Sequence, residues 1–264
     1  MAAQLYQMFF FEHILSRISV SKYKDNLILK GGVLLASIIG EDMRTTRDMD
    51  VTLKSIPLEK ENLYTIFDEI FSIDISDDVI FKIVAVKDIR SESEYGGFKI
   101  NVLGTFDNIK VNFFIELTTG DVITPKEIVY NYNSIFENQK ISVMAYTIET
   151  VIAEKFESII SKNIINTRFK DYYDLYMLLD KGYYKINKPL LTKAIKNTFK
   201  KRNTNFSISS LKEVFELIKN DSNLKKGYAI YQNKTVYVEK NDFLDIISVI
   251  KKIIDIIEKE LEKF

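Results

Sequence analysis

Two aspartates, Asp48 and Asp50, lie one residue apart in "DMDVTL" (48–53), a short stretch whose composition favours a β-strand. Side chains two residues apart on a strand point to the same face, separated by roughly 7 Å along the backbone. Two carboxylates this close repel each other unless a cation lies between them. The pair is therefore either exposed at a strand end or one half of a metal site.

A third carboxylate, Glu116, interrupts the apolar run of "FFIELT" (113–118). Burying an acidic side chain there is costly unless it has a partner, and a divalent cation would be one. Mg²⁺ prefers oxygen ligands, keeps several waters and is commonly shared with substrate phosphates. Strand alternation also allows Glu116 to point into solvent, so the sequence leaves both interpretations open.

Gly31 and Gly32 follow an apolar segment and open an apolar helix in "LILKGGVLLASII" (27–39). Glycines at such a place let backbone N–H groups approach a phosphate, and the helix N-terminus adds positive potential. A plain tight turn would explain the pair equally well.

Two ionisable residues of the C-terminal half fall on apolar helix faces. At 100° per residue, Lys155 lies inside the apolar arc of 147–162, and Asp171 lies inside that of 168–180. Asp174 falls outside that arc and could merely be solvated. A structural ion pair between Lys155 and Asp171 and a catalytic role in a solvated cleft are both consistent with the pattern, and we expect the cleft.

The elements that carry these residues are mixed in the first half of the chain and helical in the second. We expect helices at 1–20, 57–71 and 242–264, a helix after Gly32, strands at 48–53, 79–89, 96–121 with a turn at Asp107–Asn108, and 140–146, and a hairpin or two extended segments at 227–240. This pattern predicts an α+β protein with a mixed αβ core at 1–125 and a mainly helical domain at 126–264.

Composition narrows the class of protein further. The 264 residues include no cysteine and one histidine, His13, which excludes disulfides and thiolate metal sites and disfavours a histidine-based triad. The N-terminus predicts an amphipathic helix and not a signal peptide, and no apolar run approaches the roughly 20 residues of a membrane span, so we expect a cytosolic protein. The 37 basic and 37 acidic residues argue against a general polyanion binder but leave room for a local basic groove.

Together these stretches resemble the nucleotidyltransferase-like toxins of the AbiEii/AbiGii abortive-infection family. The resemblance runs from Leu29 to Leu179 and rests on the ordered set "LKGGVLL", "RTTRDMDVT", "FFIELTTGD", "AEKFES" and "RFKDYYDLY". It implies a variant of the DNA polymerase β-type nucleotidyltransferase core, followed by a helical domain that completes the active site.

The resemblance also implies roles for the strand residues. Asp48 and Asp50 match the metal-binding D-x-D of the family, and Arg44 matches the arginine that precedes it. Gly31 and Gly32 match the phosphate loop and would bind the nucleotide together with Arg44. Glu116, the third metal ligand by this comparison, stands where the family usually has aspartate, although glutamate is chemically competent.

In the helical half, Lys155 matches the lysine that holds the nucleotide phosphates, and Asp171 matches the acid of the last motif. With Asp48 and Asp50 they form the catalytic set implied by the resemblance. A carboxylate would draw the proton from the attacking hydroxyl, and the sequence does not choose between Asp50 and Asp171.

The resemblance therefore implies a Mg²⁺-dependent toxin of a toxin–antitoxin or phage abortive-infection system that uses a nucleoside triphosphate. The expected acceptor is RNA, namely the tRNA 3′ end, and a cognate antitoxin is expected as partner. Two alternatives remain open from the sequence. One is a kinase-like or nucleotidylating toxin that modifies protein, and the other is a non-catalytic nucleotide-binding module.

Overall fold

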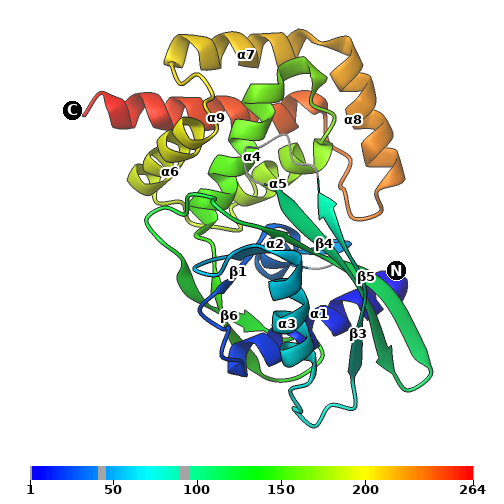
Figure 1. Cartoon of the computed structure of the whole chain (residues 1–264). Coiled ribbons are helices and arrows are strands. Elements are labelled where there is room, and N and C mark those ends of the chain that lie inside the picture. The colour runs from blue at the N-terminus through cyan, green and yellow to red at the C-terminus, as the bar shows by residue number, and fades with distance from the viewer. Residues whose placement is uncertain (1, 41–45, 90–95, 264) are drawn as a thin grey trace. The chain divides into compact units, whose positions relative to one another are not determined.

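The computed structural model describes residues 2–40, 46–89 and 96–263. The chain divides into two compact units, which we call the sheet unit (residues 1–37, 45–121 and 127–146) and the helical unit (residues 38–44, 122–126 and 147–264). Figure 1 shows strands and helices mixed in the first of these and helices in the second. The predicted α+β class is confirmed.

The sheet unit contains one mixed sheet of seven strands in the order β3-β4-β5-β2-β1-β7-β6. At its centre β2 pairs in parallel with β5 and antiparallel with β1, and β1 pairs in parallel with β7. The strands are β1 (Leu27–Lys30), β2 (Asp48–Leu53), β3 (Ile80–Ile89), β4 (Gly97–Phe106), β5 (Ile109–Thr118), β6 (Ile128–Asn133) and β7 (Lys140–Ala145). The helices are α1 (Ala2–Val20), α2 (Gly31–Ile39), which continues into the helical unit, and α3 (Lys60–Phe71).

The predicted turn at Asp107–Asn108 is confirmed as the two-residue connection of the β4–β5 hairpin. Asp107 has a φ of 50°, a conformation that aspartate tolerates better than most residues. By contrast, β6 was not predicted. It lies at the edge of the sheet and buries only Tyr132 fully, so its sequence lacks the alternation that marks a half-buried strand.

Helix α1 covers the apolar face of the sheet, which fixes the face that remains for polar side chains. Phe10 and Phe11 contact Phe113 of β5, with ring centroids 5.9 and 5.4 Å apart. Phe113 and Ile115 lie on one face of β5, whereas Glu116 points to the opposite face. The packing of α1 therefore leaves Glu116 and its strand neighbours on the face away from this aromatic cluster.

The amphipathic character predicted for α1 is wrong, because its ionisable residues Glu12, His13 and Arg17 are buried as well. Glu12 accepts hydrogen bonds from the Tyr132 hydroxyl and from backbone and side-chain groups that follow β6. Arg17 forms a two-pronged ion pair with Asp77 at 2.6 and 2.7 Å, and His13 contacts the same carboxylate. The polar residues in the sequence mark buried contacts between elements and not a solvent-facing side.

The Arg17–Asp77 pair predicts an acid-dependent contribution to stability. Burial alone would raise the pKa of Asp77, but hydrogen bonds from Arg17 and the Val79 N–H, with the Arg17 charge, lower it below its ordinary value. The pair therefore stabilises the fold above the ordinary aspartate pKa, and this stabilisation is lost as pH falls through the lower, folded-state value. We expect Asp77→Asn to lower the urea midpoint near neutral pH, and its deficit against wild type to shrink towards about pH 3.

The neighbouring exposed Asp78 provides the control for this prediction. Asp78→Asn removes the same charge without touching Arg17, so its urea midpoint should follow wild type at every pH. A deficit of Asp77→Asn that stays constant with pH would contradict an electrostatic origin.

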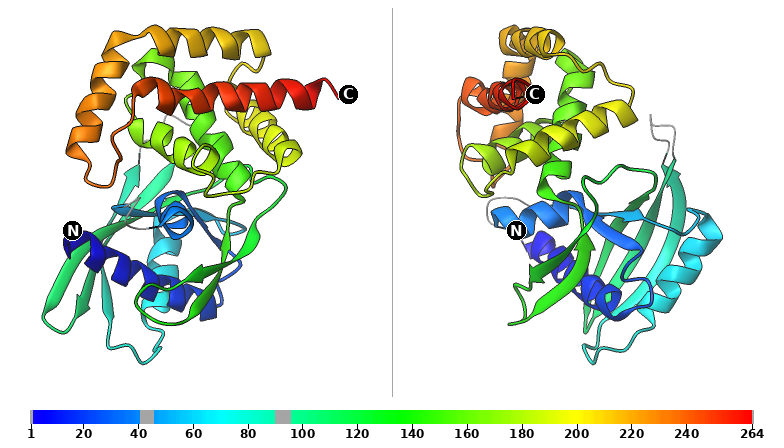
Figure 2. Two further views of the ribbon diagram at one scale, coloured as in Figure 1. Left: turned by 180° about the vertical axis from the view of Figure 1, so that it is seen from behind. Right: turned by 90° about the vertical axis from the view of Figure 1, so that its left-hand side faces the viewer.

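In the helical unit every helix except α5 begins at a residue whose side chain caps it; the Thr147 side chain, for example, accepts the Thr150 N–H at the start of α4. Helix α9 packs against α5, α6 and α7, as Figure 2 allows the reader to follow. The helices are α4 (Ile148–Lys162), α5 (Phe169–Leu179), α6 (Lys188–Lys201), α7 (Ile208–Asn220), α8 (Ser222–Lys234) and α9 (Phe243–Leu261), with a 3-10 turn at Asn163–Ile165. In the described part of the chain, no helix combines the length and apolar content needed to span a membrane.

The extended segments predicted at 227–240 are wrong, because α8 covers the first part of this range. The Asp221 side chain caps the helix by accepting the Leu224 N–H at 2.7 Å. Leu224 and Tyr228, four residues apart, are buried on one side of the helix. The aromatic residues that suggested strands serve helix packing here, because tertiary contacts override weak β-propensity.

Candidate functional site

Strand register brings the predicted acidic residues onto one face of the sheet. Asp50 on β2 lies opposite Glu116 on β5, and Asp48 is two residues earlier on the same face of β2. Two lysines join them, because Lys30 on β1 lies opposite Asp50, and Lys99 on β4 lies opposite Glu116. We call these five residues the charged face. The alternation argument for Asp48 and Asp50 is thereby confirmed, and both side chains are half-buried.

Lys99 is, with Lys30, one of the two members of the charged face that sequence reasoning missed. Its Nζ donates to Glu116 Oε1 at 2.7 Å and lies 3.6 Å from Asp48 Oδ1, above the ring of Phe114. The cation expected between the carboxylates is, in this arrangement, an ammonium group. Nothing local in the sequence shows this, because the contact depends on the pairing of β4 with β5.

The charges around Asp48 oppose one another. Burial raises the pKa of Asp48, the Lys99 charge lowers it, and the charges of Glu116 and Asp50 raise it again, leaving it above the ordinary value. Burial lowers the pKa of Lys99, but its hydrogen bond to Glu116 and the Asp48 charge outweigh this and raise it. Lys99 therefore remains protonated, and the carboxylates favour a cation beside them.

The Gly31–Gly32 turn has a visible role in seating Asp50. The Gly32 N–H donates to Asp50 Oδ2 at 3.0 Å, and Gly31 has a φ of 58°. A Cβ added at Gly31 would lie 2.0 Å from the same carboxylate oxygen, so only glycine allows this approach. The turn therefore places Asp50 at the N-terminus of α2, where the helix dipole favours negative charge. Its role in binding phosphate stays a prediction.

We expect Gly31→Ala to displace the Asp50 carboxylate and to remove activity together with stability. Gly182→Ala is the matched control, since Gly182 also has a positive φ, 76°, but has nothing within 4 Å of an added Cβ. The control should lose only the conformational cost of alanine in this region, about 1–2 kcal/mol. Urea unfolding should show a larger loss for Gly31→Ala, and equal losses would contradict the proposed collision with Asp50.

Lys30 and Asp121 form a second ion pair beside the charged face. Lys30 Nζ lies 2.6 Å from Asp121 Oδ2 and donates to Thr118 Oγ1 at 2.7 Å. The Tyr146 hydroxyl donates to the same Asp121 oxygen at 3.2 Å. Both charged residues lie inside stretches that the sequence analysis quoted, Lys30 in "LKGGVLL" and Asp121 at the end of "FFIELTTGD", which is the signal that could have found them. The pair ties the end of β5 to β1.

In the helical unit, Lys155 lies between two carboxylates. Its Nζ is 2.6 Å from Asp171 Oδ1 and 2.8 Å from Asp174 Oδ2, and the three side chains are 12%, 5% and 0% exposed. Arg168, itself exposed, donates to the other oxygen of Asp171 at 3.0 Å. Of the two arrangements that the sequence left open, the structure contains the ion pair. The catalytic roles of Lys155 and Asp171 stay predictions.

The interpretation that Asp174 could merely be solvated is wrong, because its side chain is fully buried. All the residues of α5 are buried except Lys170, so its helical wheel has no solvent-facing side on which Asp174 could lie. The apolar arc of the wheel indicated which residues pack, but it did not delimit what is buried. Asp174 is therefore a full member of the buried cluster formed with Lys155 and Asp171.

The oxygen donors of the charged face fit a divalent cation in part. Asp48 and Asp50 supply the one or two carboxylates by which Mg²⁺ is usually held beside substrate phosphates. Glu116 is instead engaged by Lys99, and the described residues contain no group of three acidic or histidine side chains already arranged around a metal position. Glu116 as third ligand stays a prediction, and Arg44 lies outside the described residues.

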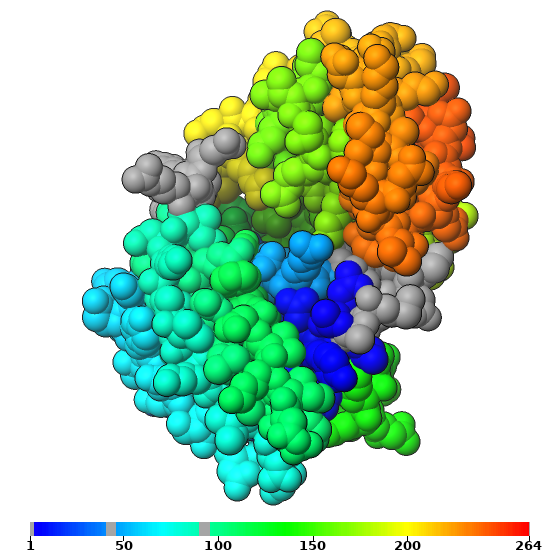
Figure 3. Space-filling model, turned by 90° about the vertical axis from the view of Figure 1, so that its right-hand side faces the viewer, coloured from blue at the N-terminus to red at the C-terminus, as the bar shows by residue number. Residues whose placement is uncertain are grey.

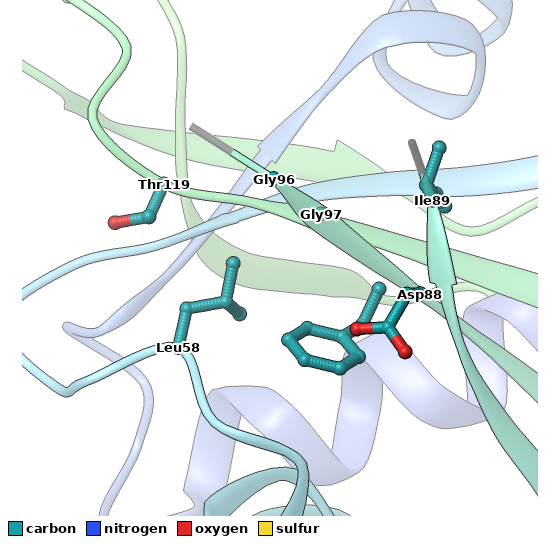
Figure 4. Close-up of a pocket in the computed structure, with 7 residues that line it drawn as sticks. Leu58, Asp88, Ile89, Gly96, Gly97 and Thr119 are labelled. Carbon is teal, nitrogen blue, oxygen red and sulfur yellow. The ribbon is translucent and has the colours of Figure 1, made fainter. Parts of the chain in front are cut away.

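A separate pocket in the sheet unit contains none of the predicted site residues (Figure 4). Asp88 is the one charged residue among the described residues that line it, and its negative charge is unsuited to a triphosphate. Its lining residues are Leu58, Asp88, Ile89, Gly96, Gly97, Phe98 and Thr119. The charged face therefore remains the candidate site of this unit.

A family model described as "Nucleotidyl transferase AbiEii toxin, Type IV TA system" matches residues 13–249. The chain belongs to the AbiEii family. The expected family is thus confirmed, and with it a nucleotidyltransferase-type toxin of a type IV toxin–antitoxin system, which has an antitoxin as its counterpart. Nucleotidyltransferases generally use divalent metals, which agrees with the carboxylates of the charged face.

Solved structures extend the AbiEii assignment to the fold. A candidate nucleotidyltransferase from Helicobacter pylori is 15% identical, with a TM-score of 0.54 over 98% of this chain and 96% of that one. JHP933 from Helicobacter pylori is 14% identical, with a TM-score of 0.55 over 98% and 94%. At these identities the likeness concerns the fold alone, and it confirms the nucleotidyltransferase-like core. A search of curated proteins finds no match to this sequence.

Proposed function

We propose that this AbiEii protein transfers a nucleotide from a nucleoside triphosphate to the 3′ end of an RNA, with tRNA as the acceptor, and thereby blocks growth. The observation that carries the proposal is the register of β2 with β5, which gathers Asp48, Asp50 and Glu116 on one face. The seat of Asp50 at the start of α2 supports it further. The proposal implies that the protein acts in the cytoplasm, as the toxin of a toxin–antitoxin or phage abortive-infection system.

The proposed chemistry is a displacement at phosphorus. The acceptor hydroxyl oxygen forms a bond to the α-phosphorus, the bond to pyrophosphate breaks, and Asp50 or Asp171 takes the hydroxyl proton. Mg²⁺, when bound by Asp48 and Asp50, would neutralise phosphate charge. Under this proposal the chain supplies the positioning that dominates such transfers: the Gly31–Gly32 turn, whose Gly32 N–H seats Asp50 at the start of α2, and the ammonium of Lys155 for phosphate.

The test is transfer of label from each of four α-labelled nucleoside triphosphates to total RNA and total protein, with a γ-labelled set in parallel. Label from an α-position in RNA is expected, and 3′-end digestion should release it. Label in protein would support the alternative of a nucleotidylating or kinase-like toxin, according to the position labelled. Label in neither, with nucleotide binding intact, would support a non-catalytic module.

Glu116 allows a sharp test of its role at the charged face. We expect Glu116→Asp to keep substantial transfer and Glu116→Ala to lose most of it, on the order of 100-fold, equivalent to roughly 2–3 kcal/mol. Since Glu116 also holds Lys99, the loss has two explanations that a double variant separates. If Glu116 contributes directly, Lys99→Met/Glu116→Ala stays inactive, as we expect. Recovery in the double variant would show that Glu116 merely keeps Lys99 from Asp48.

A further inference from the structure

One segment of this electrically neutral chain is strongly basic. Between 181 and 212 the sequence has nine lysine or arginine residues and no acidic residue, although 37 of the 264 residues of the chain are acidic. This segment comprises the whole of α6, the connections on either side of it and the start of α7. The neutral net charge therefore hides a local concentration of positive charge.

Ion pairs neutralise basic residues that precede and follow α6, but not those along its exposed side. Lys181, Arg202 and Lys212 each pair with a glutamate of the helical unit. In contrast, Lys193, Lys196 and Lys200 form no ion pair with any of the described residues, and all three are exposed. We call these three residues the α6 stripe.

The spacing of the α6 stripe places its charges in one line. Residues three and four apart share one face of a helix, and the stripe extends over about 10 Å at 1.5 Å per residue. The opposite face of α6 is buried through Leu191, Ile195 and Phe199. Its orientation is thus fixed by the core, and the stripe must face solvent.

Helix stability does not explain the stripe. Like charges three and four residues apart destabilise a helix, and no glutamate or aspartate within α6 offsets them. Lys188 adds a positive charge at the N-terminus of α6, where the helix dipole opposes it. The arrangement therefore fits an external polyanion better than a merely solvated surface.

The chemistry of the stripe selects one class of polyanion. Binding to a membrane surface requires apolar side chains beside the basic ones, and those of α6, apart from Pro189 in its first turn, are buried or half-buried in the unit. Protein interfaces likewise use aromatic or aliphatic anchors, which the stripe lacks. A nucleic-acid backbone needs only a row of cations matched to its closely spaced phosphates.

We propose that the α6 stripe binds the phosphate backbone of the RNA acceptor. The choice of RNA over DNA rests on the proposed function, whereas the polyanion site rests on the stripe alone. The stripe would hold RNA without reading its sequence, because lysine contacts to phosphate position a nucleic acid and base contacts specify it.

The experiment compares two triple variants that remove equal charge. Lys193→Gln/Lys196→Gln/Lys200→Gln changes the stripe, and Lys225→Gln/Lys226→Gln/Lys234→Gln changes three exposed lysines of α8. Helix α8 is the segment drawn in orange in Figure 3. Binding of fluorescent tRNA is followed by anisotropy without nucleotide, over a series of salt concentrations. The stripe variant should bind about 10- to 100-fold more weakly at low salt, with a salt slope smaller by about 2. The α8 variant should stay within about twofold of wild type.

A conservative variant and a second readout separate this inference from the proposed function. Lys193→Arg/Lys196→Arg/Lys200→Arg should bind tRNA like wild type. In the transfer assay the glutamine stripe variant should show a raised KM for RNA with unchanged kcat and unchanged KM for nucleotide.

A stripe variant that binds tRNA as wild type does, or an α8 variant that loses as much tRNA binding as the stripe variant, would overturn the inference even if transfer to RNA occurs. Loss of binding to phosphatidylserine vesicles but not to tRNA would overturn it as well. If wild type transfers to no RNA, the proposed function fails, while the binding comparison still decides the stripe.

Discussion

Replacing Asp50 by asparagine is expected to abolish nucleotide transfer and growth arrest while leaving the protein folded. The amide keeps the shape of the carboxylate, and its oxygen can still accept the Gly32 N–H. Removing one charge also relieves repulsion from Asp48 and Glu116, so the stability should hold or rise slightly. The substitution removes a negative charge that would bind the divalent cation. The cation stabilises the transition state by several kcal/mol, so its loss should lower the rate on the order of a thousandfold.

The measurement is transfer of label to RNA and growth on induction, at matched protein abundance. Asp48→Asn should behave like Asp50→Asn, because both carboxylates belong to the charged face. Asp107→Asn, in the exposed hairpin turn, is the control and should retain full activity, since asparagine tolerates the positive φ there. An Asp50→Asn protein that still arrests growth would exclude the charged face as the site of chemistry.

The parts of the site that the sequence predicted are those that depend on local geometry. Alternation along one strand suffices to put Asp48 and Asp50 on one face, and a Gly-Gly pair before an apolar helix suffices to locate the turn beside them. Lys99 could not be predicted in this way, because its partner Glu116 is reached only through the register of a hairpin. The charge that balances the site is therefore a property of the sheet and not of any motif.

The errors in the helical half have a related cause. A helical wheel compares residues of one helix, whereas the burial of a residue depends on how many other elements pack around that helix. Solvation could account for Asp174 because it lies off the apolar arc, yet α5 is covered at nearly every position. Residues 227–240 were expected to be extended because of their aromatic content, which in α8 serves packing instead. Both corrections arise from tertiary contacts that one sequence does not contain.

Lys155→Met is expected to cause the largest loss of stability of any substitution considered. It removes the ammonium that the buried Asp171 and Asp174 share, and leaves Asp171 with the exposed Arg168. Removing one partner from a buried ion cluster typically costs about 3–5 kcal/mol, because the remaining charge stays desolvated. Lys251→Met, on the exposed side of α9, removes the same charge and should melt like wild type. A small effect of Lys155→Met on the melting temperature would contradict the burial of the cluster.

Stability alone does not show whether the Lys155 cluster is also catalytic, but neutralising the whole cluster does. In Lys155→Met/Asp171→Asn/Asp174→Asn the three cluster positions carry no charge, so most of the stability lost in Lys155→Met should return. A purely structural cluster would then regain transfer along with the fold. A cluster in which Lys155 holds phosphate and Asp171 acts on the acceptor would stay inactive although folded, because these charges act in the transition state and not only in folding. We expect the second outcome, with transfer at least about 100-fold below wild type; a folded and active triple variant would reduce the cluster to an ion pair that holds α4 against α5.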